Sequence, residues 1–207
     1  MRTESNTYTV IYTTLVCVLV ALVLALVSQT LKPRQQANEK AETARQILVA
    51  AGYGEMEGWR KAGNSSVLEF FNGNIVGNPQ IYTTSQLKAQ NYNIKNGKPL
   101  SLPLYRFNNG ITVLAVYGSG LWGPVWGYIG LEEDMVTVAG AYFDHESETP
   151  GLGGKIKDDP AFRASFKGKT IEQTGQIGFD AISGATMTSK GLDAAIKNWM
   201  NAYKDTE

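Results

Sequence analysis

The sequence ITVLAVYGSGLWGPVWGYIGLEEDMVTVAGAYF, at residues 111–143, decides the fold. Three short runs rich in β-branched and aromatic residues lie within it, and glycine, proline and acidic residues separate them. These runs are 111–117, 125–131 and 135–143. Only residues 132–134 separate the last two runs, so we expect an antiparallel hairpin there. A fourth short run that is rich in β-branched and aromatic residues, VLEFF at 67–71, predicts another strand.

Helical patterns flank this strand-rich middle. The end of the chain places large apolar residues at spacings of 4, 3 and 4, which is one face of an α-helix. These residues are Leu192, Ile196, Trp199 and Tyr203. Strands in the middle with helices at the ends predict an α+β domain with an antiparallel sheet and flanking helices.

A long uncharged segment precedes the domain. After a short tail at 1–9, residues 10–31 form an apolar run of 22 residues. As a helix it would be roughly 33 Å long, enough to cross a bilayer core of about 30 Å. A cleaved signal peptide would have a shorter apolar region that ends in small residues. We therefore expect a retained transmembrane helix.

A connecting helix at 32–52 should follow, and the domain should occupy 53–207. Residues 32–34 (Lys-Pro-Arg) are expected to break the anchor, and Gly52 is a natural helix C-cap. Ile47 and Leu48 come late in this helix, so only its far end should pack on the domain. Basic residues are more numerous after the anchor than before it, so the positive-inside rule taken alone would leave the domain in the cytoplasm.

Composition excludes several classes of protein. The 19 basic and 19 acidic residues cancel, which argues against nucleic acid as a partner. One cysteine permits no internal disulfide and no cluster of thiolates for a metal. The single histidine, His145, lies among carboxylates in a polar segment, where a solvated side chain is commoner than a catalytic base. The acids at 132–134 are more typical of a solvated turn than of a cation site, so no metal site is expected.

Two segments have a composition suited to ligand binding. The glycine-rich stretch 149–154 (TPGLGG) allows close approach to a ligand. It has only one feature of a phosphate-binding motif, the Lys155 that follows it. From these residues alone, a plain loop is the simpler interpretation. The second, DAISGATMTS at 180–189, directly precedes the last helix. Either Thr188 or Ser189 caps that helix, or the segment captures an anion or carries a covalent group near Thr186.

Residues 180–186 match, position by position, the signature D-x-x-(S/T)-G-A-T of proteins that carry FMN on a threonine through a phosphoester bond. Residues 148–153 match the E-T-P-G-L-G loop of the same FMN-binding domain. Residues 118–122 (GSGLW) resemble a segment of the FMN-carrying, single-anchor subunit of the sodium-translocating NADH:quinone oxidoreductases, with Val125-Trp126 in place of Met-Tyr. The sequence is therefore identified as similar to this family almost from end to end.

The resemblance implies one FMN, joined through its phosphate to Thr186, with Thr188 as the fallback. A separate Mg-dependent flavin transferase would deliver the group from FAD, so no catalytic residue is expected in this chain. The resemblance and the local residue types assign the remaining cofactor contacts, with Lys155 proposed to offset the phosphate charge. These contacts are Ser183, Gly184, Ala185, Asp180, Glu148, Thr149, Gly151, Leu152, Gly153, Lys155 and Trp122.

The same resemblance implies a membrane-anchored electron carrier within a redox-driven sodium pump. Its partners would be other membrane subunits, the flavin transferase and lipid, and its domain would face the periplasm of a bacterial inner membrane. Three alternatives stay open. They are the flavinylated subunit of the related ferredoxin-oxidising ion-translocating complex, a tethered scaffold whose SGAT stretch only caps a helix, and a stand-alone flavinylated reductase of the cell envelope.

Overall fold

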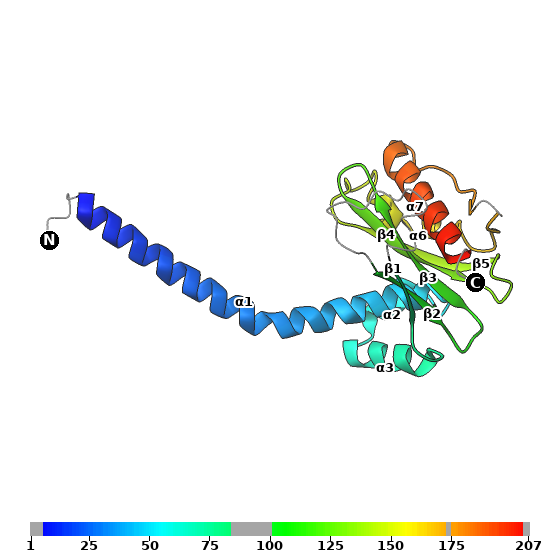
Figure 1. Ribbon diagram of the computed structural model, residues 1–207, viewed down its shortest axis with the longest axis horizontal. Helices are drawn as coiled ribbons and strands as arrows, with labels where there is room; N and C mark the ends of the chain where they lie inside the picture. The colour runs from blue at the N-terminus through cyan, green and yellow to red at the C-terminus, as the bar shows by residue number, and fades with distance from the viewer. Residues whose placement is uncertain (1–5, 84–100, 173–174, 205–207) are drawn as a thin grey trace. The chain divides into compact units, whose positions relative to one another are not determined.

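The computed structural model describes residues 6–83, 101–172 and 175–204 (Figure 1). The chain divides into two compact units, with the boundary between Glu42 and Thr43. The first unit holds most of helix α1, Asn6–Ala50, whose apolar part has a mean hydropathy of 2.9 and no buried residues. This helix is long and apolar enough to serve as a single-pass membrane anchor.

The expected break at residues 32–34 is wrong. Helix α1 continues through Pro33 without interruption. A proline removes one backbone donor, and the helix-forming residues on both sides of it carry the hydrogen-bonding pattern onward.

Helix α1 ends as its sequence predicts. Gly52 has a φ of 77°, its N–H donates to the carbonyl of Val49 at 3.1 Å, and the N–H of Tyr53 donates to the carbonyl of Leu48 at 3.0 Å. This pair of bonds is a Schellman motif, in which a glycine adopts the left-handed conformation. The fully buried Ile47 and Leu48 confirm that the far end of this helix packs on the domain.

Two short helices follow, α2 at Met56–Lys61 and α3 at Asn64–Asn74. The expected strand at 67–71 is therefore wrong, because these residues lie inside α3. Val67 is fully buried, and Leu68 and Phe71 are half-buried against the same apolar cluster. A short apolar run fits one face of a helix as well as it fits a buried strand, and here the residues form a helix.

Within the described residues, five antiparallel strands form one sheet in the order of the chain. The strands are β1 (Gln80–Thr83), β2 (Ser101–Arg106), β3 (Thr112–Ser119), β4 (Pro124–Leu131) and β5 (Val138–His145). The predicted hairpin joins β4 to β5. In its turn, the Asp134 carboxylate accepts hydrogen bonds from the N–H groups of Val136 and Thr137 at 2.9 and 2.8 Å. This acid therefore closes the turn.

Helices cover both faces of the sheet. On one face, Val113 and Phe107 pack against the end of α1 and against α3. On the other face lie α5 (Lys155–Asp158), α6 (Pro160–Ala164) and α7 (Thr186–Lys204), with α7 running along β3 and β4 (Figure 1). The strand residues buried under these three helices include Leu114, Val116, Ile129, Ala141 and Phe143. The predicted α+β fold with an antiparallel sheet is confirmed.

Candidate functional site

The Glu148 carboxylate lies where three segments of the chain meet. The residue is only 4% exposed. Its Oε1 accepts a hydrogen bond from the N–H of Trp122, in the β3–β4 turn, at 2.8 Å. Its Oε2 accepts one from the hydroxyl of Thr188, in the first turn of α7. One buried side chain thus joins the glycine-rich loop, the β3–β4 turn and α7.

Glycines make room for this carboxylate. A Cβ atom at Gly120 would lie 2.5 Å from Oε1 of Glu148, and a Cβ at Gly153 would lie 2.3 Å from Oε2. Carbon and oxygen do not approach so closely, so any larger residue at either position would displace the carboxylate. The glycine density of this loop therefore has a packing cause in addition to backbone freedom.

Hydrogen bonding keeps Glu148 ionised. Burial alone would raise the pKa of this carboxyl, but hydrogen bonds from the Thr188 hydroxyl and from the backbone amides of residues 121–123 outweigh burial and lower it. Donors that point at a carboxylate favour its charged form. The site therefore contains a buried anion at neutral pH.

The two predicted ligand-binding motifs are in contact. Gly184, in the SGAT turn, has a φ of 78°, and a Cβ atom there would lie 3.0 Å from Cδ2 of Leu152 in the glycine-rich loop. The left-handed backbone favours glycine, and the close approach of Leu152 leaves little space for a side chain. The loop and the turn thus form one site.

The helix-cap interpretation of the 180–189 segment is not supported. The Ser189 hydroxyl accepts from the N–H of Ile182 at 3.0 Å, and the Thr188 hydroxyl donates to Glu148. Both hydroxyls are therefore committed to groups outside the first turn of α7. The residue before this helix is Ala185, which has no side-chain acceptor.

The two candidate threonines differ in accessibility. Thr188 is 1% exposed, whereas Thr186 is exposed at the start of α7. Thr186 also borders a cleft of about 360 Å³ together with Lys190, one helical turn further along α7. The other residues that line this cleft are Glu172, Gln176, Ile177, Gly178, Phe179, Ala181, Ser189 and Asp193.

Four large apolar side chains in these segments are exposed. Leu121 and Trp122 extend from the β3–β4 turn, Leu152 from the glycine-rich loop and Met187 from α7, with exposed fractions from 43% to 66%. Exposed apolar side chains that gather on neighbouring segments are typical of ligand or partner sites.

The remaining predicted contacts lie at the margin of the site. The carbonyl of Thr149 accepts from the N–H groups of Leu152 and Gly154 and so closes the loop, while Gly151 supplies a φ of 75°. Ser183 and Asp180 are exposed. Lys155 begins α5 and is not among the residues that line the cleft beside Thr186. Sequence reasoning missed Lys190, although its spacing of four from Thr186 places it on the same helix face.

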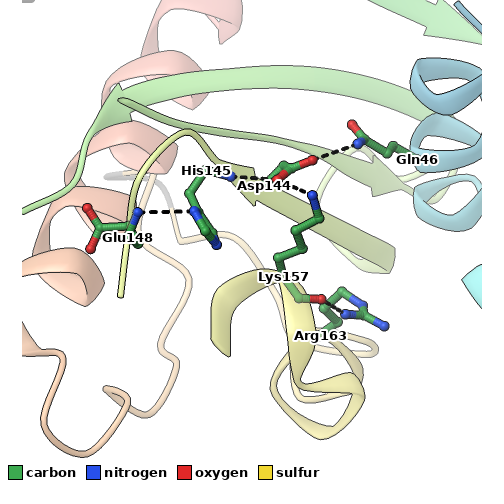
Figure 2. Close-up of polar contacts among 6 residues, drawn as sticks. All are labelled: Gln46, Asp144, His145, Glu148, Lys157 and Arg163. Carbon is green, nitrogen blue, oxygen red and sulfur yellow. Dashed lines mark hydrogen bonds and ion pairs between the residues drawn. The ribbon is translucent and has the colours of Figure 1, made fainter. Parts of the chain in front are cut away.

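A second polar network involves Asp144 and His145, which come shortly before the glycine-rich loop in the chain. Figure 2 shows Asp144, which accepts from Nε2 of Gln46 at 2.9 Å and forms an ion pair with Lys157 at 2.8 Å. The adjacent His145 accepts from the N–H of Glu148 at its Nδ1, at 3.2 Å. His145 is half-buried, and this bond lets it support the start of the loop.

The segments of this site fall within a match to a flavin-binding family. Residues 120–201 match the model of the FMN-binding domain family. The matched range includes the β3–β4 turn, the glycine-rich loop and nearly all of α7.

Named relatives identify the particular subunit that the chain resembles, which is NqrC of the Na(+)-translocating NADH-quinone reductase. The chain is 38% identical over 103 residues to this subunit from Pasteurella multocida, and spans only 39% of that protein's length. It is 27% identical to the same subunit from Vibrio anguillarum, with 82% of this chain and 80% of the relative covered.

Solved structures of the same subunit share the fold. The crystal structure of the protein from Parabacteroides distasonis has a TM-score of 0.65 and 27% identity, covering 84% of this chain and 95% of that one. The crystal structure of NqrC from Shewanella oneidensis has a TM-score of 0.61 and 23% identity, covering 79% of this chain and 93% of that one. The predicted resemblance to this subunit is confirmed.

Proposed function

We propose that this protein is the FMN-carrying NqrC subunit of a sodium-translocating NADH:quinone oxidoreductase, and that it relays electrons within that complex. The observation that carries the proposal is the match of residues 120–201 to the FMN-binding domain, in which an exposed Thr186 lines an open cleft. The comparisons name this subunit repeatedly, so the flavinylated subunit of the ferredoxin-oxidising complex is not favoured.

We further propose that FMN is bound covalently through Thr186. In the attachment step, the Thr186 hydroxyl oxygen bonds to the phosphorus of the FMN half of FAD, the bond to AMP breaks, and the hydroxyl loses its proton to the transferase. A flavin transferase with Mg²⁺ would supply FAD and the base. The exposure of Thr186 and the burial of Thr188 support this choice of residue.

The residues present fit a phosphate-linked flavin. Bound FMN would supply reversible electron transfer. Lys190 lines the cleft beside Thr186, and we assign to it, in place of Lys155, the neutralisation of the phosphate charge. Trp122 and Leu152 would cover part of the ring and exclude water from it.

We propose the periplasmic side of a bacterial inner membrane for the domain. A reporter that is active only in the cytoplasm, fused after Glu207, should then give no signal in cells that contain the membrane-inserted protein. A cytoplasmically active fusion would reverse the assignment and agree with the basic residues that follow the anchor.

The first experiment is expression of the full chain with and without a flavin transferase, followed by denaturing electrophoresis. We expect flavin fluorescence on the protein band only with the transferase. If the band stays dark although the transferase labels a control substrate, the covalent-carrier proposal fails and the tethered scaffold becomes the better interpretation. A labelled chain that is inactive in any complex would instead favour the stand-alone reductase.

A further inference from the structure

We propose that Glu148 keeps a fixed negative charge beside the flavin. This charge lowers the reduction potential of the bound FMN and so makes it harder to reduce. This inference rests on the proposed attachment of FMN to Thr186. It concerns the electrostatic role of one buried side chain, which is distinct from holding the flavin in place.

The fold fixes the position of the Glu148 carboxylate. Its carboxylate is enclosed between Gly120 and Gly153, whose missing side chains leave the space that it fills. Its oxygens accept hydrogen bonds from a backbone amide and from the Thr188 hydroxyl, both of which are neutral donors. Such donors solvate a charge without cancelling it.

No ion pair neutralises this charge in the part of the chain that the structure describes. Asp144, four residues earlier, is a useful contrast because it forms an ion pair with Lys157. The described partners of Glu148 are dipoles, the Trp122 N–H and the Thr188 hydroxyl, so its field extends into the site. In a location that is 4% exposed, water screens that field less than at the surface.

The charge lies close to the proposed attachment point. Thr188, which contacts Glu148, is two residues after Thr186 on α7, which is about 3 Å along the helix axis. Residues two apart on a helix point to different faces, so the shorter route from the carboxylate to the flavin is through Trp122 and Leu152, which would cover the ring. The N–H of Trp122 donates to Glu148, and Leu152 reaches the SGAT turn. Reduction by two electrons and one proton adds one negative charge to the flavin, and a nearby anion opposes this addition.

The test is the midpoint potential of FMN on the full chain, measured by spectroelectrochemistry with mediators. We compare wild type, Glu148→Gln and the control Glu146→Gln, which removes an exposed carboxylate from the same loop. At a fixed applied potential, Glu148→Gln should raise the ratio of reduced to oxidised flavin on the order of tenfold. Glu146→Gln should change it far less. An unchanged ratio in a fully labelled Glu148→Gln protein would overturn the inference and leave the proposed attachment intact.

A second variant serves if Glu148→Gln does not fold. Thr188→Val keeps the carboxylate but removes the hydroxyl that stabilises its charged form, so the pKa of Glu148 should rise. The flavin potential should then match wild type at alkaline pH and exceed it on acidification, as Glu148 becomes neutral. His145 also faces this loop, but it is present in both proteins and so cancels in the difference. Coincident potentials at every pH would contradict the role of the charge. An unlabelled wild type would instead defeat the proposed function itself.

Discussion

The hydroxyl of Thr188 donates a hydrogen bond to the carboxylate of Glu148, although 40 positions separate the two residues. This bond ties the first turn of α7 to the glycine-rich loop. It also commits the hydroxyl of a threonine that is 1% exposed. Of the two threonines in the ATMT segment, only Thr186 therefore presents an accessible hydroxyl.

Thr186→Ala should abolish covalent flavin labelling, because the hydroxyl that would bond to phosphorus is lost. Thr186→Ser should retain labelling because it keeps the hydroxyl. Thr188→Ala is the matched control, and it should be labelled because its hydroxyl is not the acceptor. In-gel fluorescence after denaturation measures all three variants. Label that persists in Thr186→Ala and disappears in Thr188→Ala would move the attachment point to Thr188.

Gly153→Ala should destabilise the domain, because the new Cβ would lie 2.3 Å from Glu148 Oε2 and 2.7 Å from the Thr188 hydroxyl. We expect a loss on the order of 1–3 kcal/mol, typical of overpacking in a filled site. The control is Gly58→Ala in α2, where a Cβ would meet no atom within 4 Å. Urea unfolding of the full chain in detergent, followed by circular dichroism, measures both. Equal midpoints for the two variants would show that the site adapts to the extra methyl group.

Local patterns predicted much of this fold and the outline of the site. The spacing of Leu192, Ile196 and Trp199 predicted α7, and all three are buried. The VLEFF run failed as a predictor because four apolar residues around Glu69 fit a short helix and a strand equally well. The two FMN-binding signatures, at 148–153 and 180–186, identified the two segments that meet at the site. Which side chain stabilises their junction depends on tertiary contacts such as that of Glu148 with Thr188, which no local pattern encodes.

Asp144→Asn should destabilise the domain by about 1–3 kcal/mol, because the loss of the carboxylate charge leaves Lys157 and Gln46 with a weaker acceptor. Lys157 is partly exposed, which keeps the expected loss below that of a fully buried ion pair. Asp158→Asn is the control, since Asp158 is exposed on the neighbouring helix α5. The same urea measurement applies. A midpoint for Asp144→Asn equal to that of Asp158→Asn would mean that the network adds no net stability.

Stability should fall at acid pH through Glu148. Because the pKa of this carboxyl is lower in the folded protein than its usual 4.5, folding favours the ionised form. The resulting stabilisation is complete above the unfolded-state pKa and is lost as the pH falls through the folded-state value. Wild type should therefore lose more stability than Glu148→Gln between pH 6 and the acid side of about pH 4.

The comparison is made on urea midpoints at each pH, with Glu146→Gln as the control. Because the carboxylate that this variant removes is exposed, its loss of stability on acidification should stay close to that of wild type. At neutral pH, Glu148→Gln should be less stable than wild type, because an amide replaces a carboxylate that accepts from Trp122 and Thr188. The two curves should then converge on acidification. Parallel curves for wild type and Glu148→Gln would show that Glu148 does not stabilise the fold through its charge.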